Sequence, residues 1–388
     1  MEERCALVLE DGMVFYGTSF GAPALPIERL TPGLKPLEGV GEVVFNTGMV
    51  GYFEILTDPS YTGQIVTMTY PHIGNYGVDE AWCESGPEEG RRKVKAAGFV
   101  IRSLYDGPVP EGRMSLHEYL ASQGIPGITG VDTRALTLRL RDGGSPFGVI
   151  VAVPHGREML NDEERTRVVE YLTSIPHMEG ANLIGYVGTH QVVDLEGRRP
   201  PHFAVIDCGI KANIIRELKA RDVQVTLFPS SVGADELLTP EFDAVLFSNG
   251  PGDPAVLTEQ IDLARSLIGK KPLFGVCLGH QIISLAFGAK TYKMKFGHHG
   301  INNPVRDEFT RRVFVTSQNH GFAVDEETLP DDLLVWFRNA NDATVEGIAH
   351  RDLPVKASQF HPEAGPGPHD CSWIFDEFIS TALRARKE

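Results

Sequence analysis

The strongest constraint on the fold is an alternation of short apolar strands and amphipathic helices that begins near residue 202. The pattern predicts strands at 202–207, 223–228, 242–248 and 272–276, and helices at 211–220, 257–268 and 278–287. Strands that alternate with helices form a parallel sheet with helices on both faces. We therefore predict an α/β fold with a mostly parallel, doubly wound sheet, then antiparallel strands between about 290 and 359 and a closing helix.

The chain before this region has a different pattern. Residues 1–190 carry short apolar runs between Gly, Pro and Asn, which predicts a β-rich domain. Helical signals there are limited to about 115–123 and 132–141, the second with Asp132 as a plausible N-cap. A polar stretch rich in helix and strand breakers follows, so we place a linker at 191–201 and the second domain at 202–388.

The composition argues against several classes of partner. The 388 residues include 52 Asp and Glu against 36 Lys and Arg, a formal net charge of −16, which disfavours binding to a phosphate backbone. No apolar run is long enough to span a membrane, and the first residues lack the features of a secretory signal. We therefore expect a cytoplasmic protein without nucleic-acid or membrane partners.

The cysteines and histidines predict neither disulfides nor a metal site. The five cysteines are odd in number and scattered, without a Cys-x-x-Cys pair, at positions Cys5, Cys83, Cys208, Cys277 and Cys371. His298, His299 and His320 are potential metal ligands, but no spaced set of further Cys or His residues accompanies them. The expected state is a reduced protein with free thiols and no metal.

One cysteine stands at a predicted strand-to-helix corner. Cys277 lies between Gly275 and Gly279 in Pro272-Leu-Phe-Gly-Val-Cys-Leu-Gly-His-Gln281, a cysteine form of the nucleophile elbow. Side chains at the glycines would collide in so sharp a turn, and the start of a helix favours a thiolate. A buried core cysteine before a tight turn would give the same short pattern. The junction favours a nucleophile, with the N–H of Leu278 positioned to stabilise an oxyanion.

A thiol nucleophile needs a base, and His361 is the best candidate among 13 histidines. It ends a strand-like run in Gln359-Phe-His-Pro-Glu363, and at strand spacing Glu363 faces the same way and can orient the imidazole. His-Pro-Glu alone is also common in surface turns. His280 is a rival base because it is close to Cys277 in sequence, but its position in the helix predicts that it points along another face.

Three further segments offer polar groups for a small substrate. Ser248-Asn-Gly-Pro-Gly-Asp-Pro254 follows a strand and lacks the Gly-Lys-Ser/Thr ending of a phosphate-binding loop, so we interpret the N–H of Gly252 as a second oxyanion donor. Gln281 lies one helical turn after Cys277 on the same face. The loop Ser317-Gln-Asn-His-Gly-Phe322 offers backbone groups at Gly321 and Phe322.

Together these motifs resemble the class I glutamine amidotransferases. Segments 248–254, 275–281 and 361–363 occur in the order and approximate spacing of that family. The resemblance implies that Cys277 is the nucleophile, His361 the base and Glu363 its partner, forming a Cys-His-Glu triad. It also implies a glutamine site formed by Gly250, Gly252, Leu278, Gln281, Asn319, Gly321 and Phe322.

Other segments resemble the small subunit of carbamoyl-phosphate synthases over nearly the whole chain. They are Val44-Phe-Asn-Thr-Gly-Met-Val-Gly-Tyr52, Leu56-Thr-Asp-Pro-Ser-Tyr61, Thr69-Tyr-Pro-His-Ile-Gly-Asn75, Gly130-Val-Asp-Thr-Arg-Ala-Leu136, Gly297-His-His-Gly300, Gln318-Asn-His-Gly-Phe-Ala-Val324 and Ala364-Gly-Pro-Gly-Pro-His-Asp370. One departure is Gly48, where many family members have a Ser that contacts glutamine. Residues 155–200 carry no motif beyond connecting the domains.

The resemblance implies a function and a partner. A member of this family hydrolyses glutamine to glutamate and ammonia, and passes the ammonia to a large ATP-dependent synthetase subunit that makes carbamoyl phosphate from bicarbonate. ATP and Mg²⁺ are expected on that large subunit and no cofactor on this chain, in a heterodimer or higher oligomer. Carbamoyl phosphate would then supply arginine and pyrimidine biosynthesis.

The sequence leaves three alternatives. The first is a class I amidotransferase that serves another synthase, against which the first domain argues. The second is a stand-alone cysteine hydrolase acting on γ-glutamyl amides or peptides. The third is a non-catalytic binding module, which the presence of Cys277, His361 and Glu363 disfavours.

Overall fold

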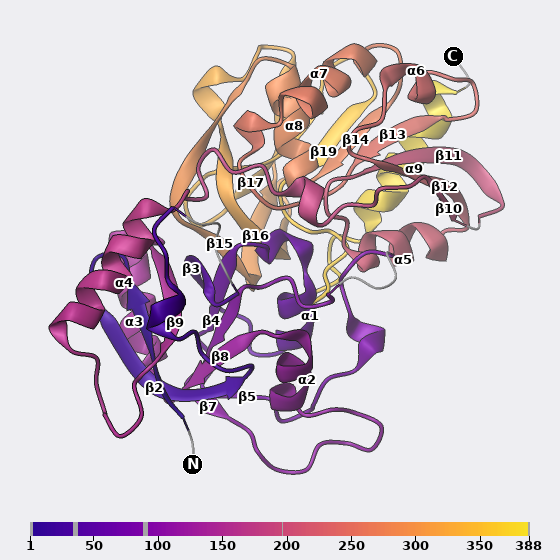
Figure 1. Cartoon of the computed structure of the whole chain (residues 1–388). Coiled ribbons are helices and arrows are strands. Elements are labelled where there is room, and N and C mark those ends of the chain that lie inside the picture. Colours follow the sequence, from indigo (N-terminus) through magenta and orange to yellow (C-terminus); the bar gives the residue numbers. More distant parts are fainter. Residues whose placement is uncertain (1–2, 34–37, 88–91, 196, 387–388) are drawn as a thin grey trace. The chain divides into compact units, whose positions relative to one another are not determined.

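The computed structural model describes residues 3–33, 38–87, 92–195 and 197–386. The chain divides into two compact units, one formed by Met1–Cys83 and Gly90–Glu179, the other by Glu84–Glu89 and Gly180–Glu388 (Figure 1). No helix in the described ranges is long and apolar enough to cross a membrane. Each unit has its own apolar clusters and is described by itself.

The first unit is built around a closed barrel with the strand order β1-β2-β8-β6-β4-β3-β9. Its strands are β1 (Arg4–Leu9), β2 (Val14–Gly21), β3 (Val40–Asn46), β4 (Gln64–Met68), β6 (Gly98–Val100), β8 (Pro126–Thr129) and β9 (Phe147–Ala152). A short parallel pair, β5 (His72–Ile73) and β7 (Ser103–Leu104), lies outside the barrel. The prediction that the first domain is rich in β-strands is therefore confirmed.

The longer helices of this unit begin at side-chain caps that the sequence provides, whereas the short first helix does not. α1 is Tyr52–Thr57 and α2 is Leu116–Gln123, which begins at a capping box formed by Ser115 and Glu118. α3, Thr133–Gly143, has Asp132 as its N-cap, as predicted. α4, Asp162–Ser174, was not predicted, although Asn161 and Glu164 form a capping box there. The segment 155–200 is therefore more than a connection.

The second unit contains a mixed sheet with the order β10-β12-β11-β13-β14-β19-β18-β17-β15-β16. Its strands are β10 (Val193–Leu195), β11 (Arg199–Asp207), β12 (Val223–Pro229), β13 (Ala244–Phe247), β14 (Leu273–Val276), β15 (Lys290–Asp307), β16 (Val313–Asp325), β17 (Leu333–Asn339), β18 (Val345–His350) and β19 (Val355–Ser358). β12, β11, β13, β14 and β19 pair in parallel. The pairs from β19 through β18, β17 and β15 to β16 are antiparallel.

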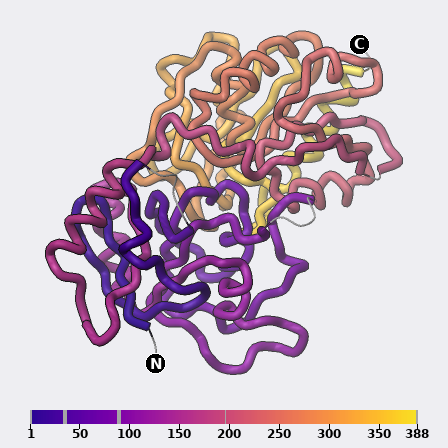
Figure 2. Tube along the Cα trace, in the orientation of Figure 1, coloured from indigo at the N-terminus to yellow at the C-terminus, as the bar shows by residue number. Residues whose placement is uncertain are grey.

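Helices cover both faces of the parallel strands. They are α5 (Ala212–Ala220), α6 (Ala234–Leu237), α7 (Thr258–Leu267), α8 (Leu278–Ala286) and α9 (Trp373–Ala385). Alternate residues of β11 point to opposite faces: Ala204 and Ile206 pack with α7 and α8, whereas Phe203 and Val205 pack with α5 and α9. The chain trace shows that α9, the last helix, lies beside β11, which is the first of the parallel strands in the sequence (Figure 2).

Two sequence predictions need correction. The sheet is not mostly parallel, because the parallel pairing stops at β19 and four antiparallel pairs extend the sheet beyond it. The predicted linker at 191–201 contains β10 and the start of β11, and the compact units divide at Glu179 and Gly180 instead. The breaker-rich Pro200-Pro201 misled the prediction, because the pairing of β11 with β12 shifts its register between Arg199 and His202 and accommodates the prolines.

The parallel strands bring distant parts of the sequence to one edge of the sheet. β11, β13, β14 and β19 are neighbours, and parallel strands end at the same edge. The segments that follow them therefore meet there, namely 208–211, 248–253, Cys277 and 359–363. This edge carries the candidate site.

Candidate active site

Cys277 occupies a strained corner between β14 and α8. Its φ of 53° and ψ of −103° are rare for a residue with a side chain, and such a conformation costs on the order of 1–3 kcal/mol. The Cys277 N–H donates to the carbonyl of Ser358 at 2.8 Å, which ties the corner to the end of β19. The residue is 2% exposed and is the N-cap of α8. The predicted nucleophile elbow is present.

The two glycines of the elbow are required by space. A Cβ atom at Gly275 would lie 2.5 Å from the carbonyl carbon of Gly279. A Cβ atom at Gly279 would lie 2.1 Å from the carbonyl oxygen of Phe247, at the end of β13. Both obstacles are backbone atoms, which cannot rotate away as a side chain can. The packing of α8 against β13 and β14 therefore depends on glycine at both positions.

Two polar groups contact the sulfur of Cys277. The carbonyl oxygen of Asn319 lies 3.6 Å from Sγ and can accept the thiol proton. Nε2 of Gln359 lies 3.6 Å from Sγ and donates to it. The donor can stabilise a thiolate, whereas the carbonyl can stabilise only the thiol. Both protonation states of the sulfur thus have a partner in the site.

His361 and Glu363 form a buried hydrogen-bonded pair. Nδ1 of His361 donates to Oε1 of Glu363 at 2.7 Å, and the two residues are 2% and 0% exposed. His361 Nε2 is buried and has no hydrogen-bond partner in the described part of the chain. Because Glu363 fixes the proton on Nδ1, the unused nitrogen is the one available for proton transfer.

The electrostatics of this pair favour the charged forms. Burial lowers the pKa of His361, but the Glu363 carboxylate and the interaction with Cys277 raise it overall, against the opposing charge of Lys211. Burial raises the pKa of Glu363, but Lys211 and His361 hold it below its usual range. The contact between Cys277 and His361 places the thiol beside a ring that readily carries a positive charge.

Lys211 is a buried cation that the sequence did not reveal. It is 1% exposed, and its Nζ lies 3.2 Å from Oε1 of Glu363 and also donates to the carbonyl of Ala364. Asn213 donates through Nδ2 to the carbonyl of Glu363 at 2.7 Å. Both residues lie at the start of α5, so the end of β11 supports the turn that carries Glu363. The sequence signal that could have identified Lys211 is a basic residue placed directly after a predicted strand of the parallel sheet.

The loop that follows β13 is held close to the elbow. A Cβ atom at Gly250 would lie 2.2 Å from the carbonyl oxygen of Cys208 and 2.8 Å from a methyl carbon of Leu278. Gly252 has a φ of 97°, and a Cβ atom there would lie 2.5 Å from the carbonyl oxygen of Ala181. The loop therefore approaches the first residue of α8, as an oxyanion site requires.

The segment 180–182 clamps this loop from the other side. Asp253 N–H donates to the carbonyl of Ala181 at 3.0 Å, and Gly180 N–H donates to Oδ2 of Asp253 at 2.9 Å. Asn182 forms a bridge with Gly252. Sequence reasoning assigned no role to residues 155–200, because nothing in the sequence pattern connects 180–182 with 252–253.

The predicted amide pocket is assembled around Gln281. Its Nε2 donates to the carbonyl of Phe322 at 2.8 Å and to Oε1 of Gln359 at 3.0 Å. Asn319 contacts Cys277 through its carbonyl, and Gly321 lies between these two strand residues on β16. The structure thus brings Gln281, Asn319 and Phe322 to the elbow, and Gly250 to Leu278. The side-chain nitrogen of Gln281 is already engaged by protein acceptors.

Gln359 and His280 complete the wall behind the sulfur. Oε1 of Gln359 accepts from Nε2 of Gln281, and Nδ1 of His280 lies 3.2 Å from the same oxygen. Burial lowers the pKa of His280 to about 4, so its ring is neutral at ordinary pH and then donates to Gln359. His280 therefore contacts Gln359, and no hydrogen bond in the described residues joins its ring to Cys277. Gln359 was quoted in the His361 motif without a role.

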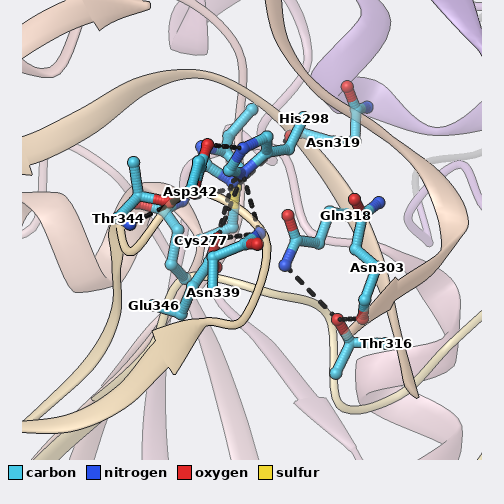
Figure 3. Close-up of polar contacts among 12 residues, drawn as sticks. Cys277, His298, Asn303, Thr316, Gln318, Asn319, Asn339, Asp342, Thr344 and Glu346 are labelled. Atoms are coloured by element: carbon cyan, nitrogen blue, oxygen red, sulfur yellow. Dashed lines mark hydrogen bonds and ion pairs between the residues drawn. The ribbon is translucent and has the colours of Figure 1, made fainter. Parts of the chain in front are cut away.

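A second group of buried ionisable residues lies in the antiparallel part of the same unit. His298, His320 and Glu346 offer three ligand atoms within 4.8 Å of one another, and they come from β15, β16 and β18. The prediction of no metal considered only cysteine and histidine spacing and did not include this carboxylate. Figure 3 shows His298 and Glu346 of this group, with Asp342 and Asn339 beside them.

Gly48 lies in the first unit and uses its backbone locally. Its N–H donates to Oδ1 of Asn46 at 2.7 Å, just beyond the end of β3. Asn46 in turn donates through Nδ2 to the hydroxyl of Tyr61 at 2.8 Å. The backbone N–H that remains at this position without a serine side chain is therefore already engaged.

Comparison with protein families defines the class of protein. Residues 204–381 match the model for class-I glutamine amidotransferases, and this range contains Cys277, His361 and Glu363. The second unit is therefore a class-I glutamine amidotransferase domain. Residues 7–150 match the model for the carbamoyl-phosphate synthase small chain, CPSase domain.

Full-length relatives narrow the class to one family. The chain is 45% identical over 380 residues to the carbamoyl phosphate synthase small chain of Methanopyrus kandleri, covering 97% of this chain and 98% of that one. It is 46% identical to the chains of the same name from Methanocaldococcus jannaschii and Akkermansia muciniphila, covering 99% of this chain in each case and 100% and 99% of those chains. The chain belongs to the carbamoyl phosphate synthase small chain family.

Proposed function

We propose that this chain hydrolyses glutamine through Cys277, His361 and Glu363 and delivers the ammonia to a large ATP-dependent synthetase subunit. The observation that carries the proposal is the strained corner at Cys277, next to a buried His361–Glu363 pair whose second ring nitrogen is unused. The partner is inferred from membership of the carbamoyl phosphate synthase small chain family, because a small chain implies that a large chain exists. The large subunit would make carbamoyl phosphate from bicarbonate.

The first chemical step is attack on the side-chain amide carbon of glutamine. The Cys277 thiolate forms the C–S bond, and the amide oxygen takes up the electron pair of the C=O bond. Gly250 and Leu278 lie close together, so the N–H groups of Gly252 and Leu278 are the proposed donors to this oxyanion. The first amides of a helix have no partner within it, which suits Leu278 to this role.

The second step breaks the C–N bond. The His361 imidazolium gives its Nε2 proton to the departing nitrogen, which leaves as ammonia, and the oxyanion collapses to a glutamyl thioester. The low pKa of Glu363 keeps this carboxylate ionised, so it stabilises the imidazolium without taking its proton. Water then attacks the thioester, His361 accepts a proton from it, and glutamate leaves as the sulfur is released.

The test separates glutamine hydrolysis from the use of ammonia. Cys277→Ser is expected to lower glutaminase turnover by at least about a thousandfold, because serine with this partner is a far weaker nucleophile. With the large subunit added, carbamoyl phosphate synthesis from ammonium salts is expected to continue. Cys371→Ser is the matched control and should keep glutaminase activity, because Cys371 is a buried cysteine just before α9 in an apolar cluster.

Three outcomes would contradict the proposal. Retained glutaminase activity in Cys277→Ser would remove the nucleophile assignment. Rapid glutamine hydrolysis that is indifferent to the large subunit would favour a stand-alone γ-glutamyl hydrolase. Stimulation by a different synthase, and not by the carbamoyl-phosphate synthase large subunit, would favour another acceptor.

A further inference from the structure

The buried group formed by His298, His320 and Glu346 is separate from the groups that carry the proposed chemistry. The three residues are 8%, 5% and 0% exposed, and their ligand atoms converge from three strands of the antiparallel part of the sheet. Neither histidine contacts Cys277, His361 or Glu363 in any hydrogen bond within the described residues. Glycine and apolar residues would cost less to bury here, so the group calls for a physical reason.

The hydrogen bonds of the two histidines fix where their protons lie. Nε2 of His298 is 2.8 Å from Oδ2 of Asp342, which can only accept, so this nitrogen carries a proton. Nδ1 of His320 is 2.8 Å from the carbonyl oxygen of Phe322, so this nitrogen also carries a proton. In neutral rings the remaining nitrogens, Nδ1 of His298 and Nε2 of His320, are lone-pair acceptors.

These two lone pairs face each other and a carboxylate oxygen. Nδ1 of His298 is 3.2 Å from Nε2 of His320 and 3.1 Å from Oε1 of Glu346, and Nε2 of His320 is 3.8 Å from the same oxygen. Nδ2 of Asn339 lies 3.2 Å from Oε1 of Glu346 and 3.5 Å from Nδ1 of His298, and neither of these contacts reaches Nε2 of His320. Oε2 of Glu346 is buried with no hydrogen-bond partner in the described residues. A cation between these three acceptors, either a metal ion or a proton, would satisfy them.

We propose that His298, His320 and Glu346 bind one Zn²⁺ ion that holds the antiparallel strands together. The point equidistant from the three ligand atoms lies about 2 Å from each, which is the length of a bond from zinc to histidine nitrogen or carboxylate oxygen. A ligand set of two imidazoles and one carboxylate suits zinc better than it suits calcium or magnesium, which prefer oxygen ligands. The unpartnered Oε2 of Glu346 is available as a further donor.

The surroundings have the form of an outer ligand shell. Zinc-binding histidines usually donate their second ring N–H to a carboxylate or a backbone carbonyl, which orients the ring and raises its basicity. Asp342 serves His298 in this way, and the carbonyl of Phe322 serves His320.

The site would stiffen one wall of the amide pocket. The carbonyl of Phe322 accepts from both His320 and Gln281, and His320 lies between Asn319 and Gly321 on β16. A zinc ion on His320 therefore fixes the strand segment that contacts Cys277 through Asn319. This consequence concerns the position of β16 and does not depend on which amide the site hydrolyses.

The first test is the metal content of the full chain, produced without a histidine tag. After dialysis in metal-free buffer, we expect elemental mass spectrometry to find close to one zinc ion per chain. Removal with a strong chelator is expected to lower the melting temperature by several degrees, and zinc alone should restore it. Less than a tenth of an equivalent of zinc, with a melting temperature indifferent to chelator and zinc, would show that a proton holds the cluster and would overturn the proposal.

The second test uses Glu346→Gln, which keeps the shape of the side chain and removes its charge. This variant should lose at least about tenfold in zinc affinity, measured by competition with a chromogenic chelator. His350→Gln is the matched control, because His350 is also paired with a carboxylate, Asp332, but outside the cluster. Equal zinc affinity in the wild type, Glu346→Gln and His350→Gln would overturn the proposal. If Glu346→Gln does not fold, the wild-type metal content decides alone.

Discussion

The two halves of the ten-stranded sheet each bury a histidine beside carboxylates, and they use it differently. His361, just beyond the parallel strand β19, gives Nδ1 to Glu363 and keeps Nε2 unused beside Cys277. His298, on the antiparallel strand β15, has both ring nitrogens engaged, by Asp342 on one side and by His320 and Glu346 on the other. An unused nitrogen can move a proton, whereas a fully engaged ring can only hold its neighbours in place.

The pKa shifts alone would not separate these two residues. The net pKa of His361 is raised to about 10 and that of His298 to about 9, in both cases by nearby carboxylates and against the effect of burial. The difference lies in what the second ring nitrogen contacts. A perturbed histidine is therefore a candidate base only where a reactive group lies within its reach.

Replacing each histidine by asparagine should give the largest contrast. His361→Asn removes the proposed acid and base, so glutaminase turnover is expected to fall by at least about a thousandfold. His298→Asn should change turnover by less than about tenfold and act on thermal stability instead. Steady-state glutamate release and melting curves measure both effects. A loss of turnover in His298→Asn as large as that in His361→Asn would break the comparison.

The carboxylate partners should repeat this contrast at a smaller scale. Glu363→Gln keeps the shape but removes the charge that orients His361, and turnover is expected to fall by about a hundredfold, less than for the nucleophile. Asp342→Asn, beside His298, should leave turnover within about threefold of the wild type because it lies outside the proposed chemistry. The comparison uses kcat from glutamate release at saturating glutamine. If turnover falls no more in Glu363→Gln than in Asp342→Asn, Glu363 is not the group that orients His361.

The elbow of the parallel half can be tested through packing. Gly279→Ala places a Cβ atom 2.1 Å from the carbonyl oxygen of Phe247, so we expect the free energy of unfolding to fall by about 3 kcal/mol, the upper end of the usual range for overpacking. Gly185→Ala is the control, since a Cβ atom there meets nothing within 4 Å. Urea unfolding measures both variants. Equal stability of the two would show that the strand-to-helix corner is looser than described.

The pH dependence of stability should be the smallest effect. The pKa of His361 in the folded chain lies above the ordinary value of 6.5, so the protonated ring stabilises the fold fully below about pH 6.5 and loses this contribution as the pH rises toward 10. The destabilisation caused by His361→Gln should therefore shrink over that range. Paired urea unfolding curves at several pH values measure it. A difference that stays constant or grows with pH would contradict the raised pKa.

The sequence predicted the parts of this molecule that depend on local pattern. The alternation after residue 202 predicted the strands and helices that surround the site, and Gly275, Cys277 and Gly279 predicted the strained corner. Asp132 predicted the start of α3. In each case the physical requirement lies within a few neighbouring residues: an apolar period, a cap, or a turn that excludes side chains.

The features that could not be predicted depend on contacts between distant segments. Glu346 joins His298 and His320 only because β18 lies near β15 and β16 in the folded sheet. Lys211 reaches Glu363 from the start of α5, about 150 residues away in the chain. The antiparallel extension was predicted, but not that it would have as many strand pairs as the parallel part, because strand order is set by long-range pairing.

Labelling with a chloroketone analogue of L-glutamine tests the central claim most directly. The carbon that carries chlorine reacts with a thiolate, and the glutamine-like part directs it to the amide pocket. We predict one equivalent of label on Cys277, located by peptide mass spectrometry, with protection by excess glutamine and slower labelling in His361→Asn. Label on Cys5, Cys83, Cys208 or Cys371 instead, or no label while the chain still hydrolyses glutamine, would contradict the account.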